Sequence, residues 1–167
     1  MTLPQGLFLA GFTVVTLAVI AFAGVVLVSA RRVDGGSFPT WALLGRIARS
    51  REERAEVARW AFYAHRISGF GIFAFLCLHV VDVSLYAFSP PLYDSVHVLY
   101  GSAPMRVFEC ALLLAICFHT LNGLRLLAVD LADLGIAASV RLLGAVTVVT
   151  VVLGVAGSIV IMRPVLS

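Results

Sequence analysis

Between Leu7 and Ala30 the chain reads LFLAGFTVVTLAVIAFAGVVLVSA, without a single charged residue. A helix needs about 20 consecutive apolar residues to cross the hydrocarbon core of a bilayer, and this stretch is longer. A removable signal peptide is the alternative for such a segment, but signal peptides have a basic start and a shorter apolar region. Here the arginines follow the apolar residues. The stretch is therefore predicted to be a transmembrane helix that is not cleaved off, with its N-terminus on the outer side of the membrane.

Three further apolar segments are each long enough to cross a membrane, over residues 60–88, 104–130 and 139–162. The chain of 167 residues is 61% hydrophobic and 13% charged, whereas soluble domains carry about 25% charged residues. The predicted fold class is all-α, an integral membrane bundle of four transmembrane helices. Small residues of the last segment are expected to let helices pack closely: Gly144, Gly154, Gly157 and Ser158.

The connector between the first two spans, residues 31–59, is rich in arginine, and the chain contains no lysine. Cytoplasmic loops of membrane proteins accumulate such residues, so this connector is predicted to lie on the cytoplasmic side of the inner membrane. The basic residues then report topology, and nucleic acid is not an expected partner. Ser50 with Glu53 three positions later is typical of a helix start, which predicts a short interfacial helix before the second span. The arginines are Arg31, Arg32, Arg46, Arg49, Arg51, Arg54 and Arg59.

Ionisable side chains inside a span are energetically expensive and mark functional sites. The second and third spans contain several, whereas the first and fourth contain none in their middles. Any cofactor chemistry is therefore expected on the second and third spans. The residues are His65, Arg66, His79, Asp82, Glu109, His119 and Arg125.

His79 and His119 each lie within an apolar run. Neutral imidazole is the common protein ligand of haem iron, and a bond to a neighbouring polar group is the alternative role. From the 1.5 Å rise per residue, His79 lies about 14 Å and His119 about 22 Å from the outer ends of their helices. The two histidines are therefore predicted not to coordinate the same iron. Each is expected to pair with a histidine of another chain.

Gly123 and Arg125, which follow His119 on the same span, extend the prediction of a haem site. Gly123, one turn later, would let a flat macrocycle or a neighbouring helix approach closely. Arg125 lies nearer the inner surface, where a guanidinium can bind a haem propionate with two hydrogen bonds. The alternative is that Arg125 and Asp130 only mark the cytoplasmic boundary of the span.

A third group of polar residues opens the second span: His65, Arg66 and Ser68, followed by Gly69. Hydrogen-bond donors at the membrane edge suit a quinone head group, and they suit haem propionates equally well. Interfacial snorkelling is the alternative. His97, in the outer loop, is expected to be exposed.

These groups resemble, in order and spacing, motifs of the cytochrome b membrane subunit of succinate dehydrogenase. The motifs are His65-Arg-Ile-Ser-Gly69, Leu78-His-Val-Val-Asp82 and Phe118-His-Thr-Leu-Asn-Gly-Leu-Arg125 with Asp130. The resemblance implies a membrane anchor of succinate:quinone oxidoreductase that pairs with a second small membrane subunit. Such anchors carry an iron–sulfur subunit and a flavoprotein subunit on the inner side, and electrons pass from succinate to a quinone, either ubiquinone or menaquinone.

The resemblance also implies residue roles. His119 would bind haem b, His79 would bind the second haem of forms that hold two, and Arg66 would lie near the quinone and propionates. One or two haems would be shared with the partner membrane subunit, and this chain alone would catalyse nothing. Phe62 departs from the family, since many members have a serine there.

The resemblance extends from about Tyr63 to Met162, and the family usually has three spans. The predicted organisation is an extra N-terminal span in residues 1–30, a connector in residues 31–59 and a three-helix anchor domain in residues 60–167. Two other functions remain open. One is a di-haem cytochrome b anchor of another membrane oxidoreductase, and the other is a haem-free structural or assembly protein.

Overall fold

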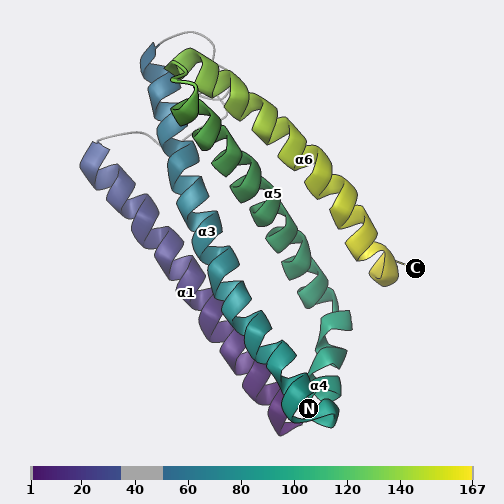
Figure 1. Cartoon of the computed structure of the whole chain (residues 1–167). Coiled ribbons are helices and arrows are strands. Elements are labelled where there is room, and N and C mark those ends of the chain that lie inside the picture. The colour runs from purple at the N-terminus through teal and green to yellow at the C-terminus, as the bar shows by residue number, and fades with distance from the viewer. Residues whose placement is uncertain (1, 35–50, 167) are drawn as a thin grey trace.

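The computed structural model describes residues 2–34 and 51–166, and every statement below concerns these residues (Figure 1). No strand occurs within them, and the chain there is helical almost throughout. The elements are α1 (Leu3–Asp34), α3 (Arg51–Phe88), α4 (Pro90–His97), the short 3-10 helix η1 (Val98–Gly101), α5 (Ala103–Leu131) and α6 (Ile136–Leu166).

Helices α1, α3, α5 and α6 are long and apolar enough to cross a membrane. This confirms the predicted all-α bundle of four spans. Residues 51–59, where a short interfacial helix was predicted, are helical and continue directly into the second span, because α3 runs without interruption for 38 residues from Arg51 to Phe88. No proline or glycine separates Arg51 from Trp60, so nothing there ends the helix. Ser50, its expected cap, lies outside the described residues.

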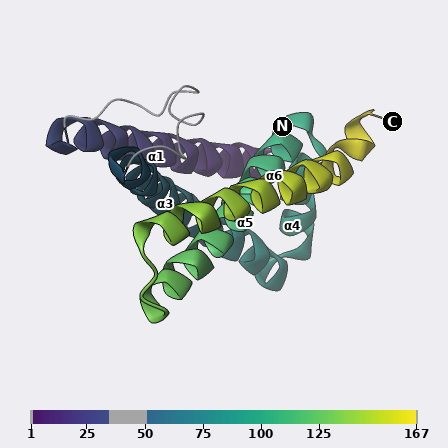
Figure 2. The same cartoon turned by 90° about the horizontal axis from the view of Figure 1, so that it is seen from above.

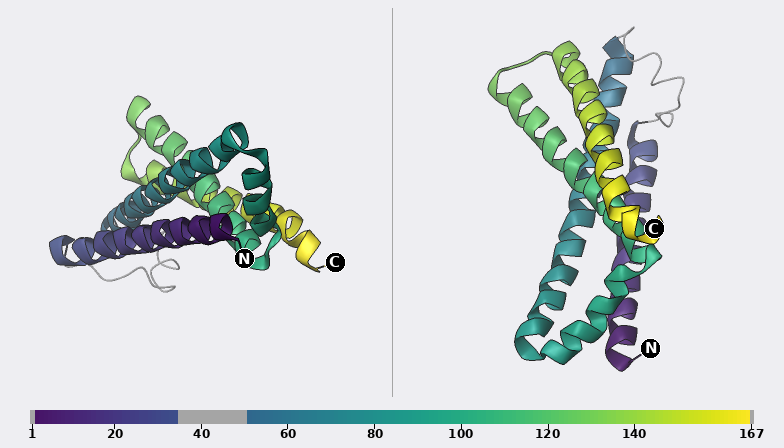
Figure 3. Two further views of the ribbon diagram at one scale, coloured as in Figure 1. Left: turned by 90° about the horizontal axis from the view of Figure 1, so that it is seen from below. Right: turned by 90° about the vertical axis from the view of Figure 1, so that its right-hand side faces the viewer.

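Helices α3, α5 and α6 form the centre of the bundle, and α1 lies along α3 on the side away from α6 (Figures 1 and 2). Helices α5 and α6 run antiparallel after a tight turn in which Asp133 takes a φ of 46°. Aspartate tolerates this left-handed conformation better than most residues. At the other end, α4 and η1 connect α3 to α5 beside the start of α1 (Figure 3).

The α5–α6 interface is built on glycine, as predicted. A Cβ at Gly154 or Gly157 would overlap the side chain of Leu114 or Leu113 on α5, so the two helices approach closely at this level. Gly144 differs, because a Cβ there would meet nothing within 4 Å. It lines a cavity instead.

Helix α1 is attached to the bundle mainly by aromatic side chains. Phe22 stacks on Phe70 of α3 with ring centroids 4.3 Å apart, and Phe12 meets Phe108 of α5 edge-on at 4.7 Å. Gln5 donates a hydrogen bond of 2.8 Å to a backbone carbonyl of α4. Contacts at three levels therefore hold α1 against the bundle along its length.

A hydrogen-bonded polar pair, a buried Asp82 and a half-buried Tyr100, connects α3 to η1. Asp82 is only 3% exposed, and one of its carboxylate oxygens accepts a hydrogen bond of 2.9 Å from the Tyr100 hydroxyl. Burial and this bond raise the pKa of Tyr100, so its phenol stays protonated and continues to donate. The other oxygen of Asp82 has no partner among the described residues.

We expect Tyr100→Phe to lower the stability of the protein by about 1–3 kcal/mol, because it leaves both oxygens of a buried carboxyl group without a donor. Thermal unfolding in detergent measures the change. Tyr93→Phe is the matched control, since the Tyr93 hydroxyl forms no hydrogen bond within the described part of the chain, where its ring packs on Tyr86 and His97. Equal unfolding temperatures for the two variants would contradict the expectation.

Candidate functional site

Two histidines from different helices meet inside the bundle. The rings of His65 on α3 and His119 on α5 stack with centroids 3.9 Å apart and planes only 4° from parallel. The sequence had grouped His65 with the polar residues at the membrane edge. The structure instead makes it the direct neighbour of the predicted haem ligand.

The orientation of His119 follows from its hydrogen bonds. Its Nδ1 lies 3.1 Å from the backbone carbonyl oxygen of His65 and 3.3 Å from the hydroxyl of Ser68. A carbonyl can only accept, so Nδ1 carries the proton and Nε2 keeps its lone pair. Metal-binding histidines characteristically bond in this way through the ring nitrogen that does not hold the metal. Ser68 donates to the same carbonyl at 2.9 Å.

Two glycines lie against the stacked rings, and Gly69 is the one that makes room for them. A Cβ at Gly69 would lie 2.6 Å from Cε1 and 3.1 Å from Nδ1 of His119, and a Cβ at Gly123 would lie 3.4 Å from Cε1 of His65. Gly123 was expected to admit either a macrocycle or a neighbouring helix, and in this chain His65 of the neighbouring helix lies there. Sequence reasoning had named Gly69 only as part of a motif.

Arg66 does not join this group. Its side chain is exposed, and its Cζ atom lies 5.7 Å from the ring centroid of Phe62, within the range of a cation–π contact. Consecutive helical residues point about 100° apart, so Arg66 leaves the face that carries His65 and Ser68. The three residues that were expected to cluster are therefore divided between two faces of α3. Arg66 contacts Phe62, the residue that departs from the family pattern.

His79 lies at another depth, as predicted. It follows Gly69, which touches His119, by ten residues, or about 15 Å along α3. This offset is larger than the sequence estimate of about 8 Å. The His79 side chain is exposed, its ring stacks on Phe75 with centroids 5.7 Å apart, and it borders a cavity of about 160 Å³ together with Tyr100 and Glu109.

Arg125 is 5% exposed and points toward the start of α6. Its Nη1 donates to the Ser139 carbonyl at 3.3 Å and to the Ser139 hydroxyl at 3.2 Å. In this chain Arg125 therefore connects α5 to α6, and its contact with a haem propionate stays a prediction. Asp130 is exposed.

Asn122 was missed by sequence reasoning. It is completely buried, and neither its amide nitrogen nor its amide oxygen has a partner among the described residues. The available signal was an uncharged amide in the middle of a span, three residues after His119 and directly before Gly123. Screening only for ionisable residues passes over such a side chain.

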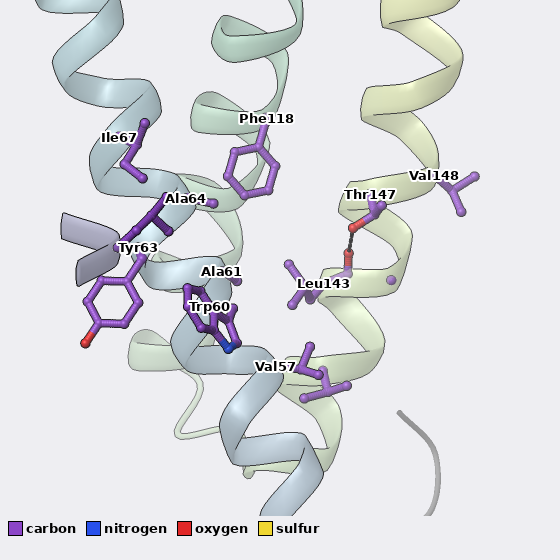
Figure 4. A pocket seen from close by; sticks show the side chains of 13 residues that line it. Val57, Trp60, Ala61, Tyr63, Ala64, Ile67, Phe118, Leu143, Thr147 and Val148 are labelled. Atoms are coloured by element: carbon purple, nitrogen blue, oxygen red, sulfur yellow. Dashed lines mark hydrogen bonds between the residues drawn. The ribbon is translucent and has the colours of Figure 1, made fainter. Parts of the chain in front are cut away.

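An apolar cavity of about 470 Å³ opens between the helices, bordered by Ala64 and Phe118, the residues that precede His65 and His119 (Figure 4). Helices α1, α3, α5 and α6 all contribute to it, and no charged side chain borders it within the described residues. Thr147 is turned to its own helix, where it donates to the Leu143 carbonyl at 2.9 Å. The cavity suits an apolar chain. Its lining consists of Leu27, Val57, Trp60, Ala61, Tyr63, Ala64, Ile67, Phe118, Val140, Leu143, Gly144, Thr147 and Val148.

Residues 46–160 match the family model of the succinate dehydrogenase/fumarate reductase transmembrane subunit. The chain belongs to this family. The matched region contains the second, third and most of the fourth span, with the histidine pair between them. The predicted resemblance is thereby confirmed, and α1 of this transmembrane subunit lies outside the matched residues.

Two relatives agree with this assignment. The chain is similar to the succinate dehydrogenase 2 membrane subunit SdhC of Mycobacterium tuberculosis, with 38% identity over 77 residues, which are 46% of this chain and 57% of that protein. It is also similar to the succinate dehydrogenase hydrophobic membrane anchor subunit of Halobacterium salinarum, with 33% identity over 99 residues, which are 55% of this chain and 76% of that protein. The match to the first relative thus spans little more than half of its length. No solved structure matches significantly.

Proposed function

We propose that this transmembrane subunit is the haem b-containing anchor of a succinate dehydrogenase and passes electrons from succinate to a membrane quinone. One observation carries the proposal: His119 Nδ1 is bonded to the carbonyl of His65, which leaves Nε2 as the ligand for iron. When bound, haem b supplies one-electron transfer. The residues present fit this group, because the ligand is preoriented in an apolar bundle.

A second histidine that holds the haem would come from the other membrane subunit. His65 is the one histidine that contacts His119 among the described residues, but its ring lies face to face with the His119 ring at 3.9 Å. Two rings that stack face to face would not both direct a nitrogen at one iron. His65 is therefore a positioning residue that fixes His119 through its ring and its carbonyl. His79 is assigned to a second haem, at the other depth.

The quinone and the soluble partners complete the proposal. Arg66 is exposed on the outer face of α3, where its guanidinium can donate to a quinone oxygen that becomes negative on reduction. The flavoprotein and iron–sulfur subunits are expected on the cytoplasmic side, the side on which residues 31–59 are predicted to lie. Succinate oxidation belongs to those partners.

The test is to purify the complex from its native membrane in mild detergent and to record its absorbance before and after addition of succinate. We expect a b-type spectrum, one or two haems per chain, and reduction of haem by succinate. An intact complex without haem absorbance would contradict the proposed haem and would show that the chain is a haem-free anchor. Haem that succinate fails to reduce, without a co-purifying flavoprotein, would favour the anchor of another oxidoreductase.

A further inference from the structure

The apolar cavity of about 470 Å³ has the volume of a small-molecule site, since such sites usually measure about 300–1,000 Å³. Helices α3 and α6 form its two sides, and Phe118 of α5 lies between them (Figure 4). Ala64, Gly144 and Val148 line the cavity and are nevertheless exposed. The cavity therefore opens onto the surface of the bundle and can be entered from the bilayer.

The lining of the cavity favours hydrocarbon over a polar ligand. No charged side chain borders it within the described residues. The Thr147 hydroxyl is already bonded to the Leu143 carbonyl of its own helix. Apolar cavities stay dry, and this one opens toward the bilayer, so the group that fills it is a hydrocarbon group.

The cavity covers the depth of one membrane leaflet. It extends over residues 57–67 of α3 and residues 140–148 of α6, which are about 15 Å and 12 Å at a rise of 1.5 Å per residue. The hydrocarbon core of a bilayer is about 30 Å thick, and both ranges end before the middle of the spans Arg54–Phe88 and Ile136–Val165. A single lipid chain fits these dimensions, whereas a transmembrane helix of another subunit would continue across the whole bilayer.

Aromatic side chains mark the head-group level at the end of the cavity where α3 begins. Trp60 and Tyr63 both line the cavity there, and their rings meet edge-on with centroids 5.8 Å apart. Trp and Tyr concentrate where the membrane meets water. A lipid chain in the cavity would therefore have its polar head group at this end.

A basic side chain lies at the same end. Arg141, Gly144 and Val148 follow the spacing i, i+3, i+7, so Arg141 shares one face of α6 with two residues that line the cavity. Its side chain is exposed, and its Nε donates to the Ala137 carbonyl at 3.4 Å. Its two terminal nitrogens form no hydrogen bond among the described residues, and a guanidinium in this position can bind a phosphate with two hydrogen bonds.

We propose that the cavity binds one acyl chain of an anionic phospholipid whose phosphate group is held by Arg141. Leu27 of α1 also borders the cavity, and α1 lies outside the residues that match the family model. The lipid chain therefore contacts α1 as well as the three helices of the matched region, and it stabilises the packing of α1 on them.

The tail of a membrane quinone is the other hydrocarbon chain that a bilayer contains, and only this step rests on the proposed function. The proposed quinone contact is Arg66, which follows Ala64 by two residues on α3. Helical residues two apart point about 200° apart. The cavity therefore lies on nearly the opposite side of α3 from Arg66, and the lipid site is separate from the proposed quinone site.

The first experiment fills the cavity in the complete complex, purified from its native membrane. A Cβ at Gly144 meets nothing within 4 Å, so Gly144→Phe has room to place its ring in the cavity. Gly11→Phe is the matched control, because a Cβ at Gly11 on α1 is equally unhindered and Gly11 does not border the cavity. After extensive washing with detergent, native mass spectrometry and extraction count the bound phospholipids and quinones. We expect Gly144→Phe to lose one phospholipid per copy of this chain and Gly11→Phe to lose none.

The second experiment tests the head group. The washed complex is mixed with detergent micelles that contain either phosphatidylglycerol or phosphatidylcholine, and its thermal unfolding is recorded. Phosphatidylglycerol should raise the unfolding temperature by about 2–4 °C more than phosphatidylcholine, because a ligand of the folded state stabilises it. Arg141→Gln should remove this difference. Arg163→Gln, which changes an exposed arginine at the opposite end of α6, should keep it.

A Gly144→Phe variant that keeps all its phospholipids, or that loses quinone instead, would overturn the inference. Equal stabilisation by the two lipids would refute the role of Arg141. If Gly144→Phe fails to assemble, a density map of the unmodified complex decides, because it should show a chain in the cavity that leads to Arg141. An empty cavity or a helix of the other membrane subunit in that place would overturn the site. A complex without haem would refute the proposed function and leave these readings intact.

Discussion

His119→Ala is expected to abolish the b-type spectrum of the haem that His119 is proposed to bind, while the complex still assembles. The substitution removes the proposed iron ligand, and a methyl group cannot replace it. The stacked ring of His65 does not take over, because its Nδ1 is buried and its face is turned toward the vacated position. The reduced-minus-oxidised spectrum and the haem count of the purified complex measure the loss.

His97→Ala is the control for this variant. His97 is exposed near the opposite end of α3, where it packs on Tyr93 and Tyr100, and its removal should leave every haem in place. His79→Ala separates one haem from two, because only a second haem at the other depth would depend on it. A full haem content in His119→Ala would refute the assignment of His119 as a ligand.

Gly69→Ala should reduce the haem content several-fold, although alanine favours helix by about 1 kcal/mol over glycine. The new Cβ would lie 2.6 Å from Cε1 of His119 and 3.1 Å from Nδ1. Real side chains do not approach so closely, so the His119 ring or α3 must move. The bond of 3.1 Å between His119 Nδ1 and the His65 carbonyl is then broken or distorted, and the ligand loses its fixed orientation.

Gly71→Ala is a matched control two residues away on the same helix. A Cβ at Gly71 would lie 3.7 Å from a methyl group of Val19, which is an ordinary contact. This variant should keep its haem and gain about 0.5–1 kcal/mol of stability from the better helix former. If Gly69→Ala and Gly71→Ala bind haem equally well, the close packing of His119 on α3 has no functional consequence.

The spans could be predicted from sequence because they depend on local composition. A run of apolar residues long enough to cross a bilayer has few other stable states than a helix. The same reasoning located His119 and His79 at different depths, since the rise per residue is constant within a helix. At the start of α3 it predicted helix over residues 51–59, and there the helix continues directly into the span, since no proline or glycine lies between Arg51 and Trp60.

The site itself depends on how α3 packs against α5. A single sequence does not specify this packing. That His65 stacks on His119 follows from the rotation and register of α3 against α5. The same rotation directs Arg66 to Phe62 on another face. Asn122 escaped notice for a different reason, because its importance lies in complete burial without a partner, and burial of this kind appears only in the packed bundle.

The extra helix α1 also changes which compartment meets each end of the chain. With three crossings, the segments that flank a bundle lie on opposite sides of the membrane. With α1 added to α3, α5 and α6, the described residues contain four helices that are able to cross a membrane, and four crossings would put Leu3 and Leu166 on the same side. A fluorescent or protease-sensitive reporter fused before α1 should therefore behave like one fused after α6. The same fusions on a variant that lacks α1 should give opposite readings.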